Sequence, residues 1–197
     1  MAKRVKRSTE TAPLKWQEAQ NLLKLLKADG LHERRLLFAL GFYTGLRISD
    51  ILRLTWGQIT GKQSFEIQEV KTGKTRPIQV NAELSGIIRE ARAAAKPDNE
   101  NDTLFRSKRG RSAGAPLTRE GANIWISDTL NRYGIKTQNP SSHTLRKTLA
   151  RRVYDQHGQT EDALIFLSQI FNHSGPAMTR KYIGITRERI DNVYLNL

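Results

Sequence analysis

A tyrosine and a histidine near the end of the chain are residue types that phosphodiester chemistry can use. Ser174 and Gly175 interrupt a helical pattern, and Pro176 suits the first position of the short helix that follows. His173 lies at this break, and Tyr182 lies on the short helix. A phenol near a proton-carrying imidazole, among basic residues, could attack a phosphodiester. The simpler interpretation is a half-buried Tyr182 and a His173 that caps a helix end.

Two arginines occur in motifs that could bind phosphate. Gly45 breaks a helix just before Arg47, and Asp50 follows one turn later on a neighbouring face. A guanidinium held by an acidic neighbour can donate two parallel hydrogen bonds to phosphate oxygens. His143 and Arg146 are three residues apart on one helical face, where one could transfer protons and the other stabilise an oxyanion. Taken alone, the first motif favours a surface ion pair, and matches to the second often arise by chance.

A third cationic group is expected at the tip of a β-hairpin. Lys71 lies at the edge of the turn Thr72-Gly73-Lys74, from which an extended side chain could reach a leaving oxygen. Lys74 and Arg76 share this location and compete for the role. The alternative for all three is a solvated hairpin tip.

The composition points to a polyanion as the partner. The 197 residues include 33 Lys plus Arg and 19 Asp plus Glu, which gives a formal net charge of +14. Interspersed apolar and aromatic runs argue against a disordered basic tail. The absence of cysteine excludes disulfides, thiolate chemistry and cysteine-based zinc sites. Since the sequence has no signal-peptide pattern and no apolar run long enough to span a bilayer, we expect a soluble, intracellular protein without membrane contact.

The length suits one domain with a core of its own. Residues 1–10 are predicted to form a flexible basic arm ahead of a domain over residues 11–197, and this arm either tracks phosphates or is simply solvated. Residues 108–115 are basic and glycine-rich, so they form either a loop against a partner or an ordinary flexible loop. The cations of these two segments are Lys3, Arg4, Lys6 and Arg7 in the arm, and Lys108, Arg109 and Arg111 in the loop.

The apolar periodicity predicts a mainly α fold with one small antiparallel β-sheet. Between residues 56 and 80 apolar and polar residues alternate, which indicates a hairpin or a three-stranded sheet. Apolar residues at helical spacing follow Tyr182, and Tyr194 among them is expected to be structural rather than a rival nucleophile. Helices are expected over residues 14–29, 31–43, from 48 onward, and over 82–95, 118–133, 142–157 and 161–172, with a last short helix that carries Tyr182.

In this order, the motifs resemble the catalytic domain of the tyrosine recombinases, the phage-integrase family. The resemblance spans roughly residues 11–197, and the complete set in compatible spacing is far more specific than any single motif. The motifs that carry it are Thr-Gly-Leu-Arg47-x-Ser-Asp50, Lys71-Thr-Gly-Lys, His143-x-x-Arg146, and His173 followed nine residues later by Tyr182.

The resemblance implies a nucleophile and a phosphate clamp. Tyr182 would form a 3′-phosphotyrosyl link and free a 5′-hydroxyl, while Arg47 and Arg146 would hold the non-bridging oxygens. His173 would add a hydrogen bond in the transition state. Losing one preorganised donor of this kind typically costs on the order of 3 kcal/mol.

The resemblance also implies how protons move. Lys71 would protonate the departing 5′-oxygen, His143 would assist proton transfer, and Asp50 would orient the Arg47 side of the site. Because the phosphotyrosine keeps the energy of the broken bond, neither ATP nor a metal ion nor another cofactor is expected.

Double-stranded DNA is the implied partner. A homo-oligomer on DNA, in the form of a synaptic tetramer, is expected, with a monomer as the free state. The implied setting is the cytoplasm of a bacterium, at the nucleoid, with the gene carried by the host, a phage or a mobile element. Integration, excision, inversion and resolution all stay open as outcomes. The side chains expected to contact DNA are Lys3, Arg4, Lys6, Arg7, Lys74, Arg76, Lys108, Arg109, Arg111, Arg180 and Lys181.

Three departures from the family pattern stand out. Lys147 follows Arg146 where the family often has histidine, and Asn172 precedes His173 where glycine is frequent. The family's N-terminal core-binding domain is expected to be absent, because only the short arm precedes residue 11, so the chain is either a fragment of a longer enzyme or similar to the small stand-alone members of the family. Two other functions stay open, namely an inactive DNA-binding regulator or accessory factor with the same fold and a type IB topoisomerase-like enzyme.

Overall fold

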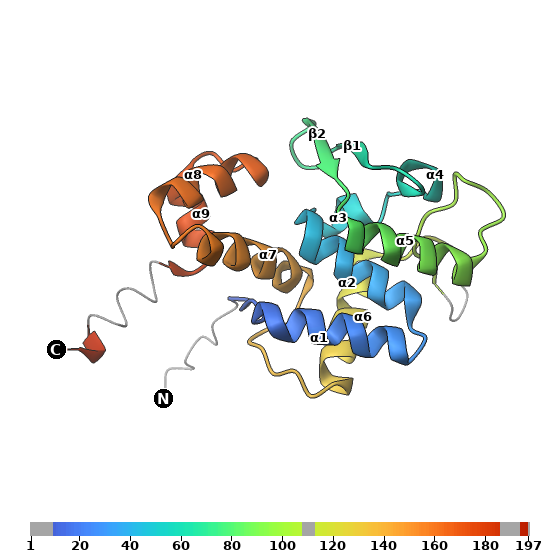
Figure 1. The fold of residues 1–197 in the computed structure, drawn as a ribbon, viewed down its shortest axis with the longest axis horizontal. Helices are drawn as coiled ribbons and strands as arrows, with labels where there is room; N and C mark the ends of the chain where they lie inside the picture. Colours follow the sequence, from blue (N-terminus) through green and yellow to red (C-terminus); the bar gives the residue numbers. More distant parts are fainter. Residues whose placement is uncertain (1–9, 108–112, 186–193, 197) are drawn as a thin grey trace, which may run out of the picture.

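Helix α2, His32–Thr44, lies at the centre of the fold. The computed structural model describes residues 10–107, 113–185 and 194–196. Every side chain from Leu36 to Phe42 is buried, as expected for a helix that is apolar around its whole circumference. It packs against α1, Trp16–Ala28, α5, Ala82–Ala95, and α7, Ser142–Gln156 (Figure 1).

The end of α2 sets the start of the next segment. Gly45 has a φ of 60°, the left-handed conformation that glycine adopts at little cost, and it ends the helix. Arg47 then caps a single helical turn, α3, Ile48–Ile51. The sequence predicted a longer helix here and an extended segment from Trp56 onward. The structure instead has a second short helix, α4, Trp56–Ile59, whose first residue is anchored by a hydrogen bond from its backbone N–H to the Asp102 carbonyl.

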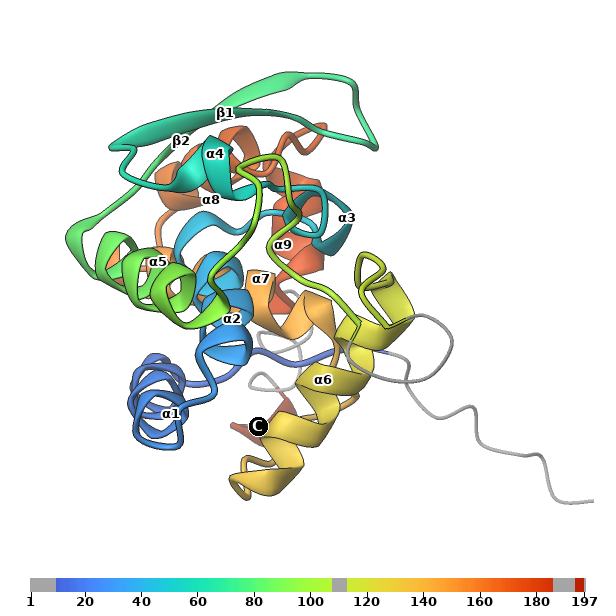
Figure 2. The same ribbon diagram turned by 90° about the vertical axis from the view of Figure 1, so that its right-hand side faces the viewer.

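The sheet within the described residues is a single antiparallel hairpin. Strands β1, Ser64–Gln68, and β2, Thr75–Gln79, pair in a register that places Phe65 opposite Ile78. Val70 lies beyond β1 in the turn rather than in a strand, and its side chain is exposed. Figure 2 shows the two strands crossing one end of the molecule above α4.

Two hydrophobic clusters meet along α7. The larger one surrounds α2 and includes residues of α6, Arg119–Arg132. The smaller one joins α7 to α8, Glu161–Ile170, and to α9, Pro176–Tyr182. In Figure 1, α8 and α9 lie on the left, beyond α7, and the hairpin with α4 and α5 lies on the right. The predicted mainly α fold with a small antiparallel sheet is therefore confirmed, and α7 connects its two halves.

Two parts of the sequence prediction fall largely outside the described residues. The basic arm is described only at Glu10, whose side chain lies 3.8 Å from the ammonium of Lys147. The C-terminal apolar stripe is described only over residues 194–196, where the side chain of Tyr194 is 74% exposed. In the described parts of the chain, no helix has the length and apolarity needed to cross a membrane.

Candidate active site

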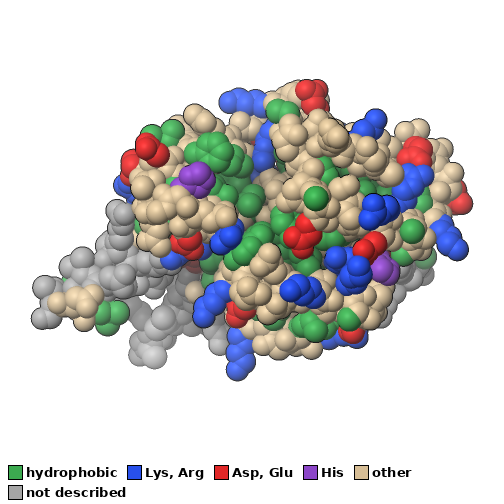
Figure 3. All heavy atoms as spheres, viewed as in Figure 1, with side chains coloured by type: hydrophobic (Ala, Val, Ile, Leu, Met, Phe, Trp, Pro, Cys, Tyr) green, Lys and Arg blue, Asp and Glu red, His purple; other side chains and the backbone are tan. Residues whose placement is uncertain are grey.

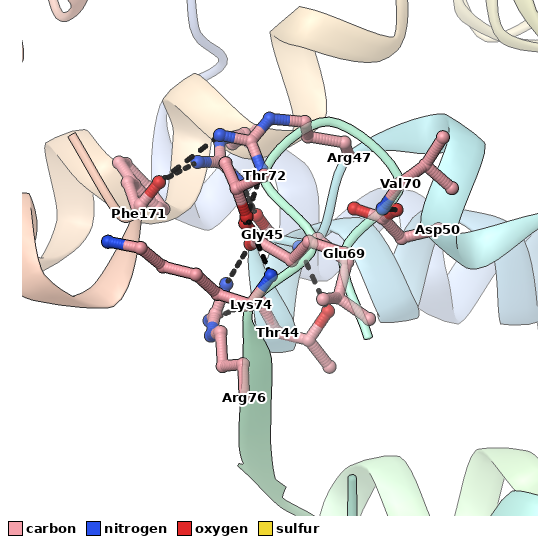
Figure 4. Close-up of polar contacts among 12 residues, drawn as sticks. Thr44, Gly45, Arg47, Asp50, Glu69, Val70, Thr72, Lys74, Arg76 and Phe171 are labelled. Atoms are coloured by element: carbon pink, nitrogen blue, oxygen red, sulfur yellow. Dashed lines mark hydrogen bonds and ion pairs between the residues drawn. The ribbon is translucent and has the colours of Figure 1, made fainter. Parts of the chain in front are cut away.

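Two arginines from different elements donate to one backbone oxygen. The Nη2 atom of Arg47 lies 3.3 Å from the Phe171 carbonyl oxygen, and Nη2 of Arg146 lies 3.0 Å from it. Figure 4 shows Arg47 and Phe171 among the polar contacts of the site. Because both guanidinium groups reach this oxygen, a phosphate oxygen at the same position could accept hydrogen bonds from both.

Arg146 is the more deeply held of the two arginines. Its side chain is buried in α7, and its Nη1 atom also donates to the carbonyl of Gly45. Its guanidinium carbon lies 4.0 Å from the centroid of the Phe171 ring, a cation–π contact. Burial lowers the pKa of Arg146 to about 10, which still leaves the group charged at neutral pH.

A buried carboxylate, that of Glu69, holds Arg47 in place. Its Oε2 atom accepts hydrogen bonds from Nη1 of Arg47 at 2.7 Å and from the hydroxyl of Thr72 at 2.8 Å. Its Oε1 atom lies 3.8 Å from Nη1 of Arg76, and its side chain is fully buried. Burial alone would raise the pKa of Glu69, but hydrogen bonds from Thr72, Arg47 and Asn172 outweigh it and hold the pKa below its ordinary value.

Glu69 was missed by the motif analysis, although the sequence contains a signal for it. Phe65 and Ile67 face the core, and Glu69 continues their two-residue alternation onto the same face. A carboxylate on the inward face of a strand must find a partner, because an unpaired buried charge is costly. The alternation therefore could have pointed to an ion pair beneath the hairpin.

Asp50 and Arg76 differ from their expected positions. The sequence predicted that Asp50 would hold the Arg47 side of the site, but its Oδ1 atom accepts from the backbone N–H of Val70 at 2.9 Å. Arg76 was predicted at an exposed hairpin tip, as a DNA contact and a rival to Lys71. Its side chain is 13% exposed and its Nη2 donates to the Thr44 carbonyl at 2.7 Å, so the group points into the protein. Burial, more than any other cause, lowers the pKa of Arg76.

Tyr182 lies against both histidines of the predicted site. Its hydroxyl is 3.3 Å from Nδ1 of His143. Its ring centroid is 5.2 Å from that of His173 and 6.0 Å from that of Phe171, both in edge-to-face arrangements. The ammonium of Lys147 lies 5.4 Å from the ring centroid. Lys147, which in the sequence was only a departure from the family pattern, is thus a neighbour of the phenol.

The electrostatics of the site keep the phenol protonated. Burial raises the pKa of Tyr182 to about 12, although the nearby Arg146 and Arg47 lower it in part. A tyrosine with this pKa needs a base to become a nucleophile at neutral pH. Partial desolvation and the surrounding cations lower the pKa of His143, so its imidazole is neutral and able to accept a proton.

His173 is held in a similar uncharged state. Burial, followed by the charges of Arg146, Arg47 and Lys71, lowers its pKa to about 4. Its Nδ1 atom lies 2.9 Å from the hydroxyl of Thr179, a fully buried residue of α9, which fixes the ring. Asn172, just before it, has a φ of 50°. Asparagine is among the few residues that tolerate this left-handed conformation, which accounts for its presence where the family often has glycine.

Two lysines of the hairpin turn reach the site. The charge of Lys71 contributes to the lowered pKa of both His143 and His173, so its ammonium lies within their electrostatic range. The side chain of Lys74 is exposed and extends towards Phe171 in Figure 4. Both lysines therefore stay candidates for the general acid.

Of the remaining predicted DNA contacts, two lie on α9 and seven lie outside the described residues. Lys181 is exposed on α9, while Arg180 forms an ion pair with Glu161 across α8 and α9. In Figure 3 the surface is hollowed between α8 and the β-hairpin, with basic side chains at the upper part of the hollow. Seven other cations lie outside the described residues, namely Lys3, Arg4, Lys6, Arg7, Lys108, Arg109 and Arg111.

A mostly helical domain in which paired arginines and a partly buried tyrosine converge defines a class, the catalytic domains of tyrosine recombinases. The chain belongs to the phage integrase family, whose model matches residues 13–189. No metal site is expected, because strand cleavage through a phosphotyrosine needs none. The residues that the structure describes contain no cluster of three His, Asp or Glu that could hold a metal ion.

Named relatives and solved structures agree with this membership. The probable integrase/recombinase YoeC of Bacillus subtilis is 34% identical over 158 residues, which cover 80% of this chain and 81% of YoeC. Tyrosine recombinase XerD of Vibrio vulnificus is 27% identical over 157 residues, 78% of this chain but 49% of XerD. This chain therefore matches about half the length of XerD.

The fold is shared with solved recombinases. XerA recombinase superposes with a TM-score of 0.71 at 21% identity, over 95% of this chain and 65% of XerA. XerH site-specific recombinase bound to palindromic difH substrate gives a TM-score of 0.71 at 19% identity, over 98% of this chain and 55% of XerH. At these identities the likeness supports the fold alone.

Proposed function

We propose that this chain cuts and rejoins DNA strands at specific sites, with Tyr182 as the nucleophile. The observation that carries the proposal is the shared acceptor of Arg47 and Arg146, since both guanidiniums donate to the oxygen of Phe171. The hydroxyl of Tyr182 lies beside His143, on the same helix as Arg146. A phosphodiester held by both guanidiniums would therefore meet the phenol.

In the proposed reaction, the phenolic oxygen of Tyr182 bonds to phosphorus, and the bond from phosphorus to the 5′-oxygen breaks. His143 accepts the phenolic proton, because its lowered pKa keeps it neutral before the reaction. Lys71 gives a proton to the departing 5′-oxygen. The products are a 3′-phosphotyrosyl link and a free 5′-hydroxyl, and attack by a 5′-hydroxyl reverses the step without an external energy source.

Arg47, Arg146 and His173 stabilise the pentacoordinate phosphorus. Negative charge gathers on the non-bridging oxygens as the phenol attacks, and donors fixed in advance interact with that charge most strongly. His173 is neutral near pH 7, so it acts as a hydrogen-bond donor rather than as a cation. Asp50 acts less directly, by fixing the backbone at Val70 and with it the lysine-bearing turn.

DNA is the proposed substrate and a synaptic tetramer the proposed working assembly, with a monomer as the free form. XerH was solved with difH substrate, and the Tn1549 transposon integrase with transposon right-end DNA. The net charge of +14 supports the same kind of partner here. The bacterial sources of YoeC and XerD favour a place at the bacterial nucleoid.

A trapped covalent adduct tests the proposal. Nicked suicide duplexes drawn from the DNA that flanks the gene should yield a protein–DNA adduct, which Tyr182→Phe abolishes while DNA binding persists. Tyr194→Phe is the matched control and should retain the adduct. An adduct that depends on Tyr194 would overturn the assignment of the nucleophile.

Two other outcomes would replace the function itself. Salt-sensitive DNA binding without any adduct would indicate a DNA-binding regulator. Relaxation of supercoiled plasmids that lack a target site would indicate a type IB topoisomerase.

A further inference from the structure

Three segments of the site meet at the side chain of Glu69. Arg47 comes from the α2–α3 junction, Thr72 from the hairpin turn, and Asn172 from the loop that carries His173. Arg76 of β2 approaches the same carboxylate. Glu69 therefore connects the phosphate clamp, the lysine-bearing turn and the α8–α9 loop, although it belongs to none of the motifs that define the family resemblance.

The backbone of Glu69 also closes the turn that carries Lys71. Its N–H donates to the carbonyl of Lys74 at 3.0 Å, and its carbonyl accepts from the N–H of Gly73 at 2.8 Å. The hydroxyl of Thr72 accepts from the N–H of Lys74 at 3.3 Å while it donates to the Glu69 carboxylate. The conformation of the turn and the placement of Arg47 therefore depend on one residue.

The charge of Glu69 separates two cations that would otherwise repel each other. Arg47 and Arg76 both lie against it, and the charge of Arg47 acts to lower the pKa of Arg76. Removing the carboxylate charge would leave two guanidiniums close together without their shared anion. A buried ion pair of this kind is costly to break from one side.

We propose that Glu69 is a positioning residue for strand cleavage, which holds the guanidinium of Arg47 and the turn of Lys71 in their working places. This inference rests on the proposed function, because it concerns the same reaction. Glu69 itself touches no reacting atom in this arrangement and acts through Arg47 and the turn.

The first test is the rate of single-turnover cleavage of a suicide duplex by Glu69→Gln. An amide keeps the shape of the carboxyl group but loses its charge, so cleavage should slow by about 10²-fold, the loss expected from a misplaced catalytic group. The DNA concentration that gives half the maximal rate should stay within about threefold of wild type, since Glu69 is buried away from solvent.

The matched control is Glu90→Gln. Glu90 also forms an ion pair with an arginine, Arg35 at 2.5 Å, but its side chain is 31% exposed and the pair lies between α5 and α2, outside the site. Its substitution should leave the cleavage rate unchanged. A Glu69→Gln enzyme that cleaves as fast as Glu90→Gln would overturn the inference.

A double-mutant cycle tests whether Glu69 acts through Arg47. Arg47→Ala should slow cleavage strongly, and adding Glu69→Gln should slow it by clearly less than the 10²-fold that Glu69→Gln costs in wild type, because one of the two groups that Glu69 supports is already gone. Fully multiplicative losses would contradict the proposed route. If Glu69→Gln fails to fold, Glu69→Asp retains the charge with a shorter reach and is expected to show a partial loss.

A readout that does not depend on cleavage separates this inference from the proposed function. In nitrogen-detected NMR spectra, the guanidinium signals of Arg47, identified by their loss in Arg47→Lys, should be resolved in wild type and averaged by rotation in Glu69→Gln. Unchanged Arg47 signals would overturn the inference. A wild-type protein that forms no adduct would instead overturn the proposed function, and the spectra would still decide whether Glu69 holds Arg47.

Discussion

Gly41 of α2 lies directly against Leu145 of α7. A Cβ atom on Gly41 would lie 2.5 Å from the Cβ of Leu145 and 2.8 Å from its Cδ1. The two helices therefore approach closely at this point. Arg146 is the next residue of α7, and its guanidinium reaches the carbonyl of Gly45, one turn beyond Gly41. This close contact thus helps to set the distance between the two arginines.

Gly41→Ala should destabilise the fold and slow cleavage. The added methyl group overpacks a full interior, and such changes typically lower the free energy of unfolding by about 1–3 kcal/mol. Gly86→Ala in α5 is the control, because a Cβ there meets no atom within 4 Å. It should raise the free energy of unfolding by about 0.5–1 kcal/mol through helix propensity. Urea unfolding measures the free energy of unfolding of both variants. A Gly41→Ala protein as stable as wild type would refute the packing argument.

Arg146→Lys should reduce both activity and stability. The guanidinium donates to Gly45 and Phe171 and stacks on the Phe171 ring, a combination that a single ammonium cannot reproduce. Loss of one such preorganised donor lowers the rate of cleavage by about 10²–10³-fold. The free energy of unfolding should fall by about 1–3 kcal/mol, because the two carbonyls lose buried partners.

Arg151→Lys on the same helix provides the comparison for Arg146→Lys. Arg151 pairs with Asp155 near the surface, at 3.1 Å from Nε to Oδ1. Its replacement should change the free energy of unfolding by about 0.5 kcal/mol or less. Equal effects of the two substitutions would show that burial of Arg146 adds nothing to its role.

The parts of the site that the sequence predicted are those that local patterns specify. Gly45 before Arg47, the break before Tyr182 and the three-residue spacing of His143 and Arg146 are all local, and the helices around them follow apolar periodicity. The fold class followed from the same periodicity.

The parts that it missed depend on tertiary contacts. No local pattern shows that Arg47 pairs with the carboxylate of Glu69, 22 residues away. Nor does any show that the backbone oxygen of Phe171 accepts from both guanidiniums. Arg76 shares the inward face of β2 with Ile78, so the alternation indicates an inward side chain, but the partners that hold it there, the Thr44 carbonyl and Glu69, come from other segments. Pairings between distant segments are thus what the sequence did not show.

The stability of the protein should decrease as the pH falls from about 6.5 towards 4. Burial lowers the pKa of His173 from 6.5 to about 4, so in this window the unfolded chain binds a proton that the folded chain does not. The free energy of unfolding therefore rises with pH through this window. Above the window the contribution of His173 to stability is fully present. Lowering the pKa of His173 from 6.5 to about 4 sets an upper bound of roughly 3 kcal/mol on this contribution, and partial solvent exposure reduces it to about 1–2 kcal/mol.

His173→Gln isolates this contribution. Urea unfolding at pH 7.5 and pH 5.0 should show a smaller loss of stability on acidification in His173→Gln than in wild type. His143→Gln tests the second histidine, whose pKa is also lowered and whose effect has the same sign. Identical pH dependence in wild type and His173→Gln would show that the imidazole titrates as it does in the unfolded chain.

The identity of the general acid can be decided between the two lysines of the hairpin turn. Lys71 acts electrostatically on both histidines, whereas the side chain of Lys74 extends towards Phe171 in Figure 4. A 5′-phosphorothiolate duplex has a sulfur leaving group that departs without a proton. Lys71→Ala should therefore be slow on the ordinary duplex and near wild type on the phosphorothiolate, while Lys74→Ala should be affected similarly on both. Rescue of Lys74→Ala instead would assign the proton transfer to Lys74, and rescue of neither would mean that the 5′-oxygen takes its proton from another group.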